Sequence, residues 1–404
     1  MMDLIDKLKY YQENNDRDKW YENQHKVDLC RELDGEFLDP AMSSVVKIET
    51  FFSYNNFIPI KTLKNRDHII LPILSKNQYS KKISLSEILI FDMETTGLMG
   101  GTGTYPFLLG FGSFEPGGIK IKQYFLPDFG REVPAYLQLV NDKQDKKILL
   151  SFNGKTFDYP LLCNRFILNR IDNPFANYEH LDLLHVARRL WKNLLETCSL
   201  ENIEREIFLF SRWRDLPGAL IPQAYFEFLR SGKCHEIKKV ILHNQQDIIS
   251  LGRLLLHLDL LENDPSGDHL NAHELQRLLH LAIKNLDLKN TDILLDLIKR
   301  RRIQLPGSIL IDLSLLLKRV QQWERAENIW MELLRAGTNV IFASEELAKY
   351  YEHRKLDLEQ AKLFTERALK HLEVLNELQV MGGDLELQEQ FIYRLNRIKR
   401  KLME

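Results

Sequence analysis

The sequence contains few cysteines, and these are scattered along the chain. Among 404 residues there are four, and no two of them form a C-x-x-C pair; they are Cys30, Cys163, Cys198 and Cys234. This spacing argues against a zinc ribbon and against a disulfide framework. It favours a protein kept in the reducing cytoplasm.

Long apolar runs and a large net charge are also lacking. The first ten residues carry four charges, and Asp312 interrupts the short apolar stretch 308–317, so we expect neither a signal peptide nor a membrane-spanning helix. The net charge of −2 gives no global attraction to nucleic acid, although a basic groove offset by acids elsewhere is compatible with it. We interpret the basic runs 212–214, 299–302 and 397–401 as solvated surface.

Length and local composition divide the chain into three regions. Residues 1–80 are expected to form an N-terminal extension, either a packing arm or edge strands. Residues 81–262 begin with strand patterns and then alternate strands with helices, which predicts an α/β domain with a mixed sheet flanked by helices. The stretch 261–268 contains Pro and Gly and indicates a linker. Residues 269–404 have helical patterns throughout.

A repeat in the last region predicts paired helices. Two sets of residues recur at an offset of 35 positions: Ala326, Trp330 and Leu333, then Ala361, Thr365 and Ala368. Small residues where helices approach closely, repeating about every 34 residues, are typical of tetratricopeptide-like hairpins, which generally bind proteins. Thr365 departs from the large residue expected at its position, and a generic helical bundle is the alternative.

One predicted buried strand ends in two acids. Asp92 and Glu94 alternate along the strand, so they share a face with Ile88 and Ile90. Carboxylates on an apolar face repel each other and lose water at high cost, and a divalent cation held by oxygen ligands relieves both effects. Gly97 then allows a sharp turn of the backbone. The alternative is an amphipathic strand whose acids face solvent.

Two further segments carry acids that are candidates to join this pair. Asp158 follows the predicted strand 147–152 where a helix begins, and a helix N-cap is the simpler explanation for this acid taken alone. In the predicted helix 235–257, Asp247 lies along the apolar stripe, and His243 lies one turn earlier on the same side. An acid that faces the core needs a partner, and a metal ion is a sufficient one.

Four carboxylates from three segments fit two-metal phosphoryl chemistry. Two cations about 4 Å apart activate a water molecule and stabilise the departing oxygen of a phosphodiester. His243 would take the proton from the attacking water. Asp182, in the segment His-Leu-Asp-Leu-Leu-His at residues 180–185, is a candidate supporting or structural acid.

The order of these residues resembles that of the DEDD 3′→5′ exonucleases of the ribonuclease H-like fold. Several segments between residues 85 and 260 resemble the corresponding sequences of the YprB family; these segments are 91–97, 104–107, 123–126, 151–158, 180–185, 215–218 and 243–247. That family commonly carries a C-terminal tetratricopeptide-like region, which agrees with the repeat. The resemblance implies a ribonuclease H-like α/β domain followed by an all-α tetratricopeptide-like helical domain.

The resemblance also implies roles for the candidate residues. Asp92, Glu94, Asp158 and Asp247 would hold Mg²⁺ or Mn²⁺ in a two-metal site, and His243 would be the general base. Relatives with a His base usually place it five residues before the last acid, and those with a Tyr base place it four before. Here His243 precedes Asp247 by four positions.

Other candidates follow from position near the acids. Thr95 and Asn153 are expected to meet the sugar or phosphate of a terminal nucleotide. Arg165 is a candidate for backbone phosphate, with a salt bridge on the helix surface as the alternative. Phe157 and Tyr159 are candidates for stacking on bases, with burial in the core as the alternative for Phe157.

The sequence therefore predicts a cytoplasmic metal-dependent nuclease, and the resemblance implies that it trims a nucleic-acid strand from its 3′ end. The resemblance favours DNA in a repair pathway as the substrate and a helicase as a protein partner. No sequence motif indicates a contact to the 2′-OH group that distinguishes RNA from DNA. The alternatives are an RNA exonuclease, a structure-selective endonuclease on the same fold, and a tetratricopeptide scaffold with a vestigial nuclease core. The turn 215–218 is expected to shape the groove wall.

Overall fold

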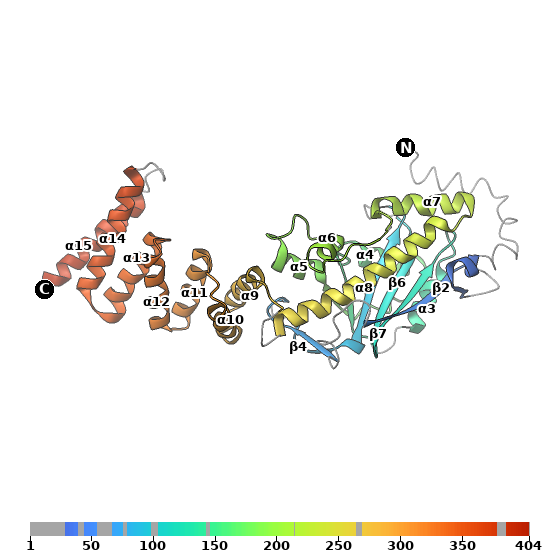
Figure 1. The fold of residues 1–404 in the computed structure, drawn as a ribbon, viewed down its shortest axis with the longest axis horizontal. Helices are drawn as coiled ribbons and strands as arrows, with labels where there is room; N and C mark the ends of the chain where they lie inside the picture. Colours follow the sequence, from blue (N-terminus) through green and yellow to red (C-terminus); the bar gives the residue numbers. More distant parts are fainter. Residues whose placement is uncertain are drawn as a thin grey trace. The chain divides into compact units, whose positions relative to one another are not determined.

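The chain divides into two compact units, Met1–His269 and Leu270–Glu404, shown in Figure 1. The computed structural model describes residues 29–38, 44–54, 67–75, 79–97, 104–142, 146–213, 215–263, 269–377 and 385–403. Much of the expected extension 1–80 lies outside these residues. Within the described ranges, no helix is both long enough and apolar enough to cross a membrane.

A seven-stranded mixed sheet forms the centre of the first unit. Its strands, in spatial order, are β1 (Glu36–Phe37), β2 (Val46–Ser53), β7 (Gly118–Phe125), β6 (Pro106–Glu115), β5 (Ile88–Thr95), β8 (Ile148–Ser151) and β9 (Glu179–Asp182). Neighbours from β1 to β5 are antiparallel, whereas β8 and β9 run parallel to β5. A separate two-stranded sheet joins β3 (His68–Leu71) to β4 (Tyr79–Ser84). The predicted mixed α/β sheet is confirmed.

The local sequence accounts for most of these strands. β6 and β7 form a hairpin, and Gly117 at its tip has φ +84°, a left-handed conformation that glycine adopts at little cost. The strand β9 was not predicted from the sequence. This strand has four residues with the sequence Glu-His-Leu-Asp, too short for an alternating pattern, and its partner β8 lies far away along the chain.

Helices flank the sheet of the first unit: α3 (Val133–Asp142), α4 (Asp158–Leu168), α5 (Leu183–Trp191), α6 (Leu200–Glu206), α7 (Ile221–Ser231) and α8 (His235–Asn263). The long helix α8 packs against β5, β6 and β7 and crosses the sheet in Figure 1. Its predicted apolar stripe is buried, as at Val240, Ile248 and Leu251. Because α8 continues to Asn263, the expected linker begins later than residue 261, and residues 264–268 lie outside the described ranges.

Two glycines of β6 allow α8 to lie very close to the sheet. A Cβ atom on Gly110 would lie 2.1 Å from Asn244 Oδ1, and one on Gly112 would lie 2.5 Å from Ile248 Cγ2. Protein interiors do not tolerate such approaches without movement of the backbone. Gly110 is also the cross-strand partner of Asp92. The glycines therefore hold this part of α8 over the first predicted acid.

The described part of the second unit is built from helices: α9 (Ala272–Lys284), α10 (Leu288–Arg300), α11 (Gly307–Arg319), α12 (Trp323–Arg335), α13 (Val340–Tyr350), α14 (Leu358–Glu377) and α15 (Leu385–Met403). A π-helical turn, Tyr351–Lys355, follows α13. α11 packs with α12, and α13 with α14. The six residues of the predicted repeat are all buried. A helical domain after the α/β domain is thus confirmed.

Candidate active site

The predicted acids meet at one edge of the sheet. Asp92 and Glu94 lie in the second half of β5, and Asp158 begins α4 shortly after β8. Because β5 and β8 are parallel, their carboxyl ends reach the same edge. With Asp247 and His243 of α8, these acids line a single cavity of about 260 Å³. The structure therefore brings the five predicted residues together from three segments of the chain.

The acids of this cavity stand in surroundings that oppose their ionisation. Burial raises the pKa of Asp92 and of Glu94 well above their usual values, and the neighbouring carboxylates raise both further. Burial also raises the pKa of Asp158 to about 7. Glu94 is only 9% exposed, so an amphipathic strand with solvent-facing acids is wrong. Crowded, desolvated carboxylates are the donor set that a divalent cation fits.

The closest grouping includes the histidine. Among the described residues, Glu94, His243 and Asp247 each offer one ligand atom within 4.8 Å of the others. Asp158 is not the N-cap residue that was its alternative explanation, because the N-cap position of α4 is held by Phe157 and Asp158 is the first residue of the helix. The carboxylate of Asp158 accepts a hydrogen bond from its own backbone N–H and also lines the cavity.

His243 is oriented by an acid of the turn 215–218. Its Nδ1 lies 2.9 Å from both carboxylate oxygens of Asp215. Since a carboxylate only accepts hydrogen bonds, Nδ1 carries the proton and Nε2 is the acceptor in the neutral ring. Nε2 lies 3.6 Å from Asp247 Oδ2, too far for a direct hydrogen bond. The same turn contributes Gly218 to the cavity wall.

The buried Arg212 donates hydrogen bonds to two acids of the site, Asp215 and Asp247. Arg212 donates to Glu204 at 2.6 and 2.7 Å, to Asp215 at 3.1 Å, and to Asp247. Its side chain is 7% exposed, so the interpretation of run 212–214 as solvated surface is wrong for Arg212; residue 214 lies outside the described ranges. Burial lowers the pKa of Arg212, but its hydrogen bond to Glu204 and the charge of Asp247 raise it more. Arg212 therefore fixes the positions of Asp247 and of Asp215, the hydrogen-bond partner of His243.

A line of buried amides holds the first acid. Asn244 Nδ2 donates to Asp92 Oδ2 at 2.7 Å, and Gln123 Nε2 donates to Asn244 Oδ1 at 2.8 Å. Gln245 Nε2 donates in turn to Gln123 Oε1 at 2.8 Å and to Thr50 Oγ1 at 3.2 Å. The three amide side chains are buried. These amides, which come from α8 and β7, fix the orientation of the Asp92 carboxylate.

Asp182 fastens the turn that carries Asp158. Its carboxylate accepts from the backbone N–H groups of Asn153 at 2.8 Å, Lys155 at 3.2 Å and Leu184 at 3.0 Å. Asn153 has φ +64°, a left-handed conformation in which asparagine is enriched. Asp182 is therefore a structural acid of the β8–α4 turn. Asn153 contributes its backbone to this turn, and it does not line the cavity.

Two of the remaining candidates line the cavity. Thr95 lies beside the acids, and its hydroxyl donates to the Gly97 carbonyl at 2.7 Å. Phe157 is 46% exposed and also lines the cavity, so burial in the core is the wrong alternative for this ring.

The other two candidates have partners elsewhere and do not line the cavity. Arg165 pairs with Glu132, donating from Nε at 3.0 Å, and Glu132 is buried. Arg165 therefore forms the salt bridge that was its alternative role, but its partner Glu132 is buried rather than on the helix surface. The hydroxyl of Tyr159 donates to the Phe175 carbonyl at 3.2 Å, and its ring packs beside the core.

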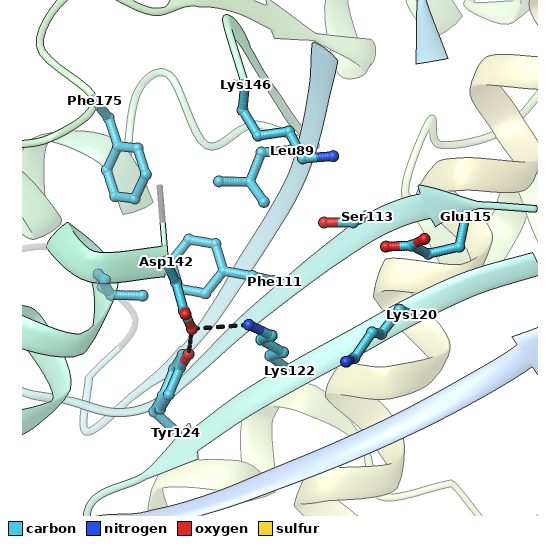
Figure 2. A pocket seen from close by; sticks show the side chains of 11 residues that line it. Leu89, Phe111, Ser113, Glu115, Lys120, Lys122, Tyr124, Asp142, Lys146 and Phe175 are labelled. Atoms are coloured by element: carbon cyan, nitrogen blue, oxygen red, sulfur yellow. Dashed lines mark hydrogen bonds and ion pairs between the residues drawn. The ribbon is translucent and has the colours of Figure 1, made fainter. Parts of the chain in front are cut away.

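A second cavity of the first unit lies on the opposite face of the sheet. Figure 2 shows Lys122 and Tyr124 converging on Asp142, at 2.9 and 2.6 Å. Lys120, at the same cavity, pairs with Glu49 at 3.0 Å. Because these polar groups satisfy one another and none of the four predicted acids lines this cavity, it is not the chemical centre.

The fold and the acid cavity define a protein of the ribonuclease H superfamily, and residues 89–259 match that superfamily. The chain is also similar to protein YprB of Bacillus subtilis (strain 168), with 32% identity over 358 residues that cover 87% of this chain and 82% of the relative. The chain therefore belongs to the YprB family. Its first unit is a domain of the nuclease type, whose substrates are nucleic acids.

The structure adds residues that the sequence analysis missed. Arg212, Asn244 and Gln123 all contact the acids or their supports, and each does so through a partner distant in the sequence. One signal was present, because Gln123 and Asn244 stand inside segments that resemble the YprB family. Nothing local distinguished them from surface amides.

Proposed function

We propose that this protein is a divalent-metal-dependent exonuclease that removes nucleotides from the 3′ end of a single strand, with DNA in a repair pathway as the favoured substrate. The observation that carries the proposal is the convergence of four carboxylates and one histidine on a single cavity. Asp92, Glu94, Asp158 and Asp247 offer the hard oxygen ligands that Mg²⁺ and Mn²⁺ prefer.

The residues of the cavity have different roles in the proposed hydrolysis. When bound, two divalent cations would neutralise the acids and the phosphate and lower the pKa of the attacking water. His243 accepts the water's proton at Nε2, and Asp215 steadies the resulting imidazolium through Nδ1. Arg212 and Asn244 hold the carboxylates of Asp247 and Asp92 in fixed orientations.

The cavity wall supports a terminal nucleotide as the substrate. Phe157 offers an exposed aromatic face beside the acids, suited to stacking on a base without preference for sequence. Thr95 lies next to Glu94 at the same wall and provides a hydroxyl for a sugar or phosphate. The 3′ polarity rests on the resemblance to the DEDD exonucleases.

A cleavage assay on a 5′-labelled single strand tests the proposal. With Mg²⁺ or Mn²⁺ we expect a ladder that shortens one nucleotide at a time, faster on DNA than on RNA of the same sequence, and no products from Asp158→Asn. Discrete internal fragments would instead make the protein an endonuclease, and faster digestion of RNA would make it an RNA exonuclease. A folded wild-type protein that leaves every strand intact would favour the scaffold.

A further inference from the structure

A pocket of about 330 Å³ in the second unit is rich in cations and has no part in the proposed nuclease chemistry. Five lysine or arginine residues line it beside one acid, Glu346; the five are Lys318, Lys349, Arg354, Arg394 and Arg397. The π-helical turn Tyr351–Lys355 brings Arg354 to this wall, and such irregular turns often occur at functional sites.

The acids near the pocket do not balance these cations. Lys318 and Lys349 pair with Glu346 at 2.5 and 3.2 Å, and Lys349 also pairs with Glu345 at 2.6 Å. Glu352, whose side chain is fully buried, pairs with Arg397 at 2.7 Å. Four of the five lining cations share these three acids, and Glu352 also pairs with Lys401. The pocket therefore keeps a positive charge that favours an anion.

Two hydrogen-bond donors of the pocket residues lack an acceptor. Within the described part of the chain, Trp330 Nε1 and Arg394 Nη1 are buried and have no hydrogen-bond partner. Arg394 Nη1 lies 3.5 Å from Glu352 Oε2, which is an ion pair but longer than a normal hydrogen bond. Buried N–H groups are nearly always bonded. Two such groups in one basic pocket point to an acceptor that comes from another molecule.

The aromatic rings of the pocket are not free to stack on bases. Trp323 is stacked on Tyr350 at 5.9 Å, and the Arg354 guanidinium covers its ring at 4.7 Å. Trp330 is 0% exposed. The volume is at the lower end of the range for ligand pockets, about 300 to 1,000 Å³. The pocket thus suits one small anionic group rather than a nucleobase.

We propose that this pocket binds a carboxylate of an acidic peptide segment from a partner protein. The carboxylate accepts hydrogen bonds from Trp330 Nε1 and Arg394 Nη1, and Lys318 and Arg397 add favourable charge. Charge-assisted hydrogen bonds of this kind are the strong ones in proteins. The site lies wholly within the second unit, so the proposal goes beyond the nuclease function and does not depend on it.

Fluorescence anisotropy with the full chain tests the proposal. The probe is a fluorescein-labelled peptide rich in Asp, and its controls are the same peptide with every Asp replaced by Asn and a labelled oligothymidine. We expect the Asp peptide to bind at least tenfold more tightly than the Asn peptide. Arg394→Gln should weaken that binding about tenfold, because a charge-assisted contact is lost.

Two further variants separate binding from folding. Trp330→Phe keeps the ring but removes an N–H that has no acceptor, so it should leave thermal stability unchanged while weakening the Asp peptide several-fold. Lys370→Gln makes the same charge change as Arg394→Gln on the exposed surface of α14 and should leave binding unchanged. Nuclease activity should be unaltered in all three variants.

Three results would overturn the proposal. The first is equal affinity for the Asp and Asn peptides, and the second is full affinity in both Arg394→Gln and Trp330→Phe. The third is oligothymidine binding that exceeds peptide binding and is lost in Arg394→Gln, which would assign the pocket to nucleic acid.

Discussion

At the residue scale, the cavity collects side chains whose charges oppose folding. Asp92, Glu94 and Asp158 all have raised pKa values because burial and mutual repulsion disfavour their ionised forms. Functional sites commonly hold such unfavourable groups and depend on the rest of the fold for stability. A variant that removes one of these charges should therefore separate activity from stability.

Glu94→Gln should abolish cleavage and stabilise the metal-free protein by about 1 kcal/mol or more at pH 8. The folded-state pKa of Glu94 lies above its unfolded value, so its ionisation opposes folding above the unfolded pKa, and the gain should vanish below about pH 4. Urea unfolding in a chelating buffer measures the gain. Glu179→Gln, on an exposed residue of the same unit, is the control and should change neither property. A destabilised but active Glu94→Gln would contradict the expectation.

His243→Ala should slow single-turnover cleavage on the order of 10² to 10⁴-fold if the imidazole is the general base. The folded structure should persist, since His243 lines the cavity and Asp215 keeps its ion pair with Arg212 when the imidazole is removed. Asp247→Ala should abolish cleavage altogether. A loss of less than about tenfold in His243→Ala would move the base role to another group.

His257 should make the first unit less stable in mild acid. Its ring packs against Trp191 and Phe208, its Nε2 has no hydrogen-bond partner in the described structure, and burial lowers its pKa to about 4. As the pH falls, His257 is protonated in the unfolded chain before it is protonated in the folded protein. The free energy of unfolding is therefore unaffected above about pH 6.5 and decreases as the pH falls toward 4.

The size of this effect is about 1 to 2 kcal/mol between pH 7.5 and 5. His257→Leu removes the titrating group while keeping an apolar side chain of similar size. Urea unfolding of both proteins at the two pH values should show a smaller loss in the variant. Equal losses would mean that His257 does not contribute.

At the scale of elements, the sequence predicted what local patterns encode. The 3.6-residue stripe gave α8, and the alternation of apolar residues with acids gave β5 and its pair Asp92 and Glu94. The partners of Arg212 lie as far as 35 positions away, and no local pattern carries that information. The same holds for the line of amides between Asn244 and Thr50.

Gly110→Ala tests the close approach of α8 to β6. The added methyl group would lie 2.1 Å from Asn244 Oδ1, so the helix or the amide must move, at a cost of about 2 kcal/mol. Because Asn244 holds Asp92, Mg²⁺ or Mn²⁺ binding measured by calorimetry should weaken as well. Gly218→Ala is the control for stability, since its Cβ meets no atom within 4 Å. Equal melting temperatures for the two variants would refute this account.

At the scale of the whole molecule, the two proposed activities fall in separate compact units. The acid cavity lies within residues 1–269, and the cationic pocket lies within 270–404. We expect a fragment of residues 1–269 to cleave short single strands within about tenfold of the full chain. The fragment 270–404 should bind the Asp peptide and cleave nothing. A folded first fragment without activity would show that the second unit completes the active site.

The fastening of the β8–α4 turn by Asp182 has a consequence for genetic screens. Three backbone amides lose their common acceptor when this carboxylate is removed, and the neighbouring Asp158 then loses its fixed position. A survey of inactive variants would thus rank Asp182 among the catalytic acids, although it is not one of the residues that line the cavity. Loss of function at this position would report architecture rather than chemistry.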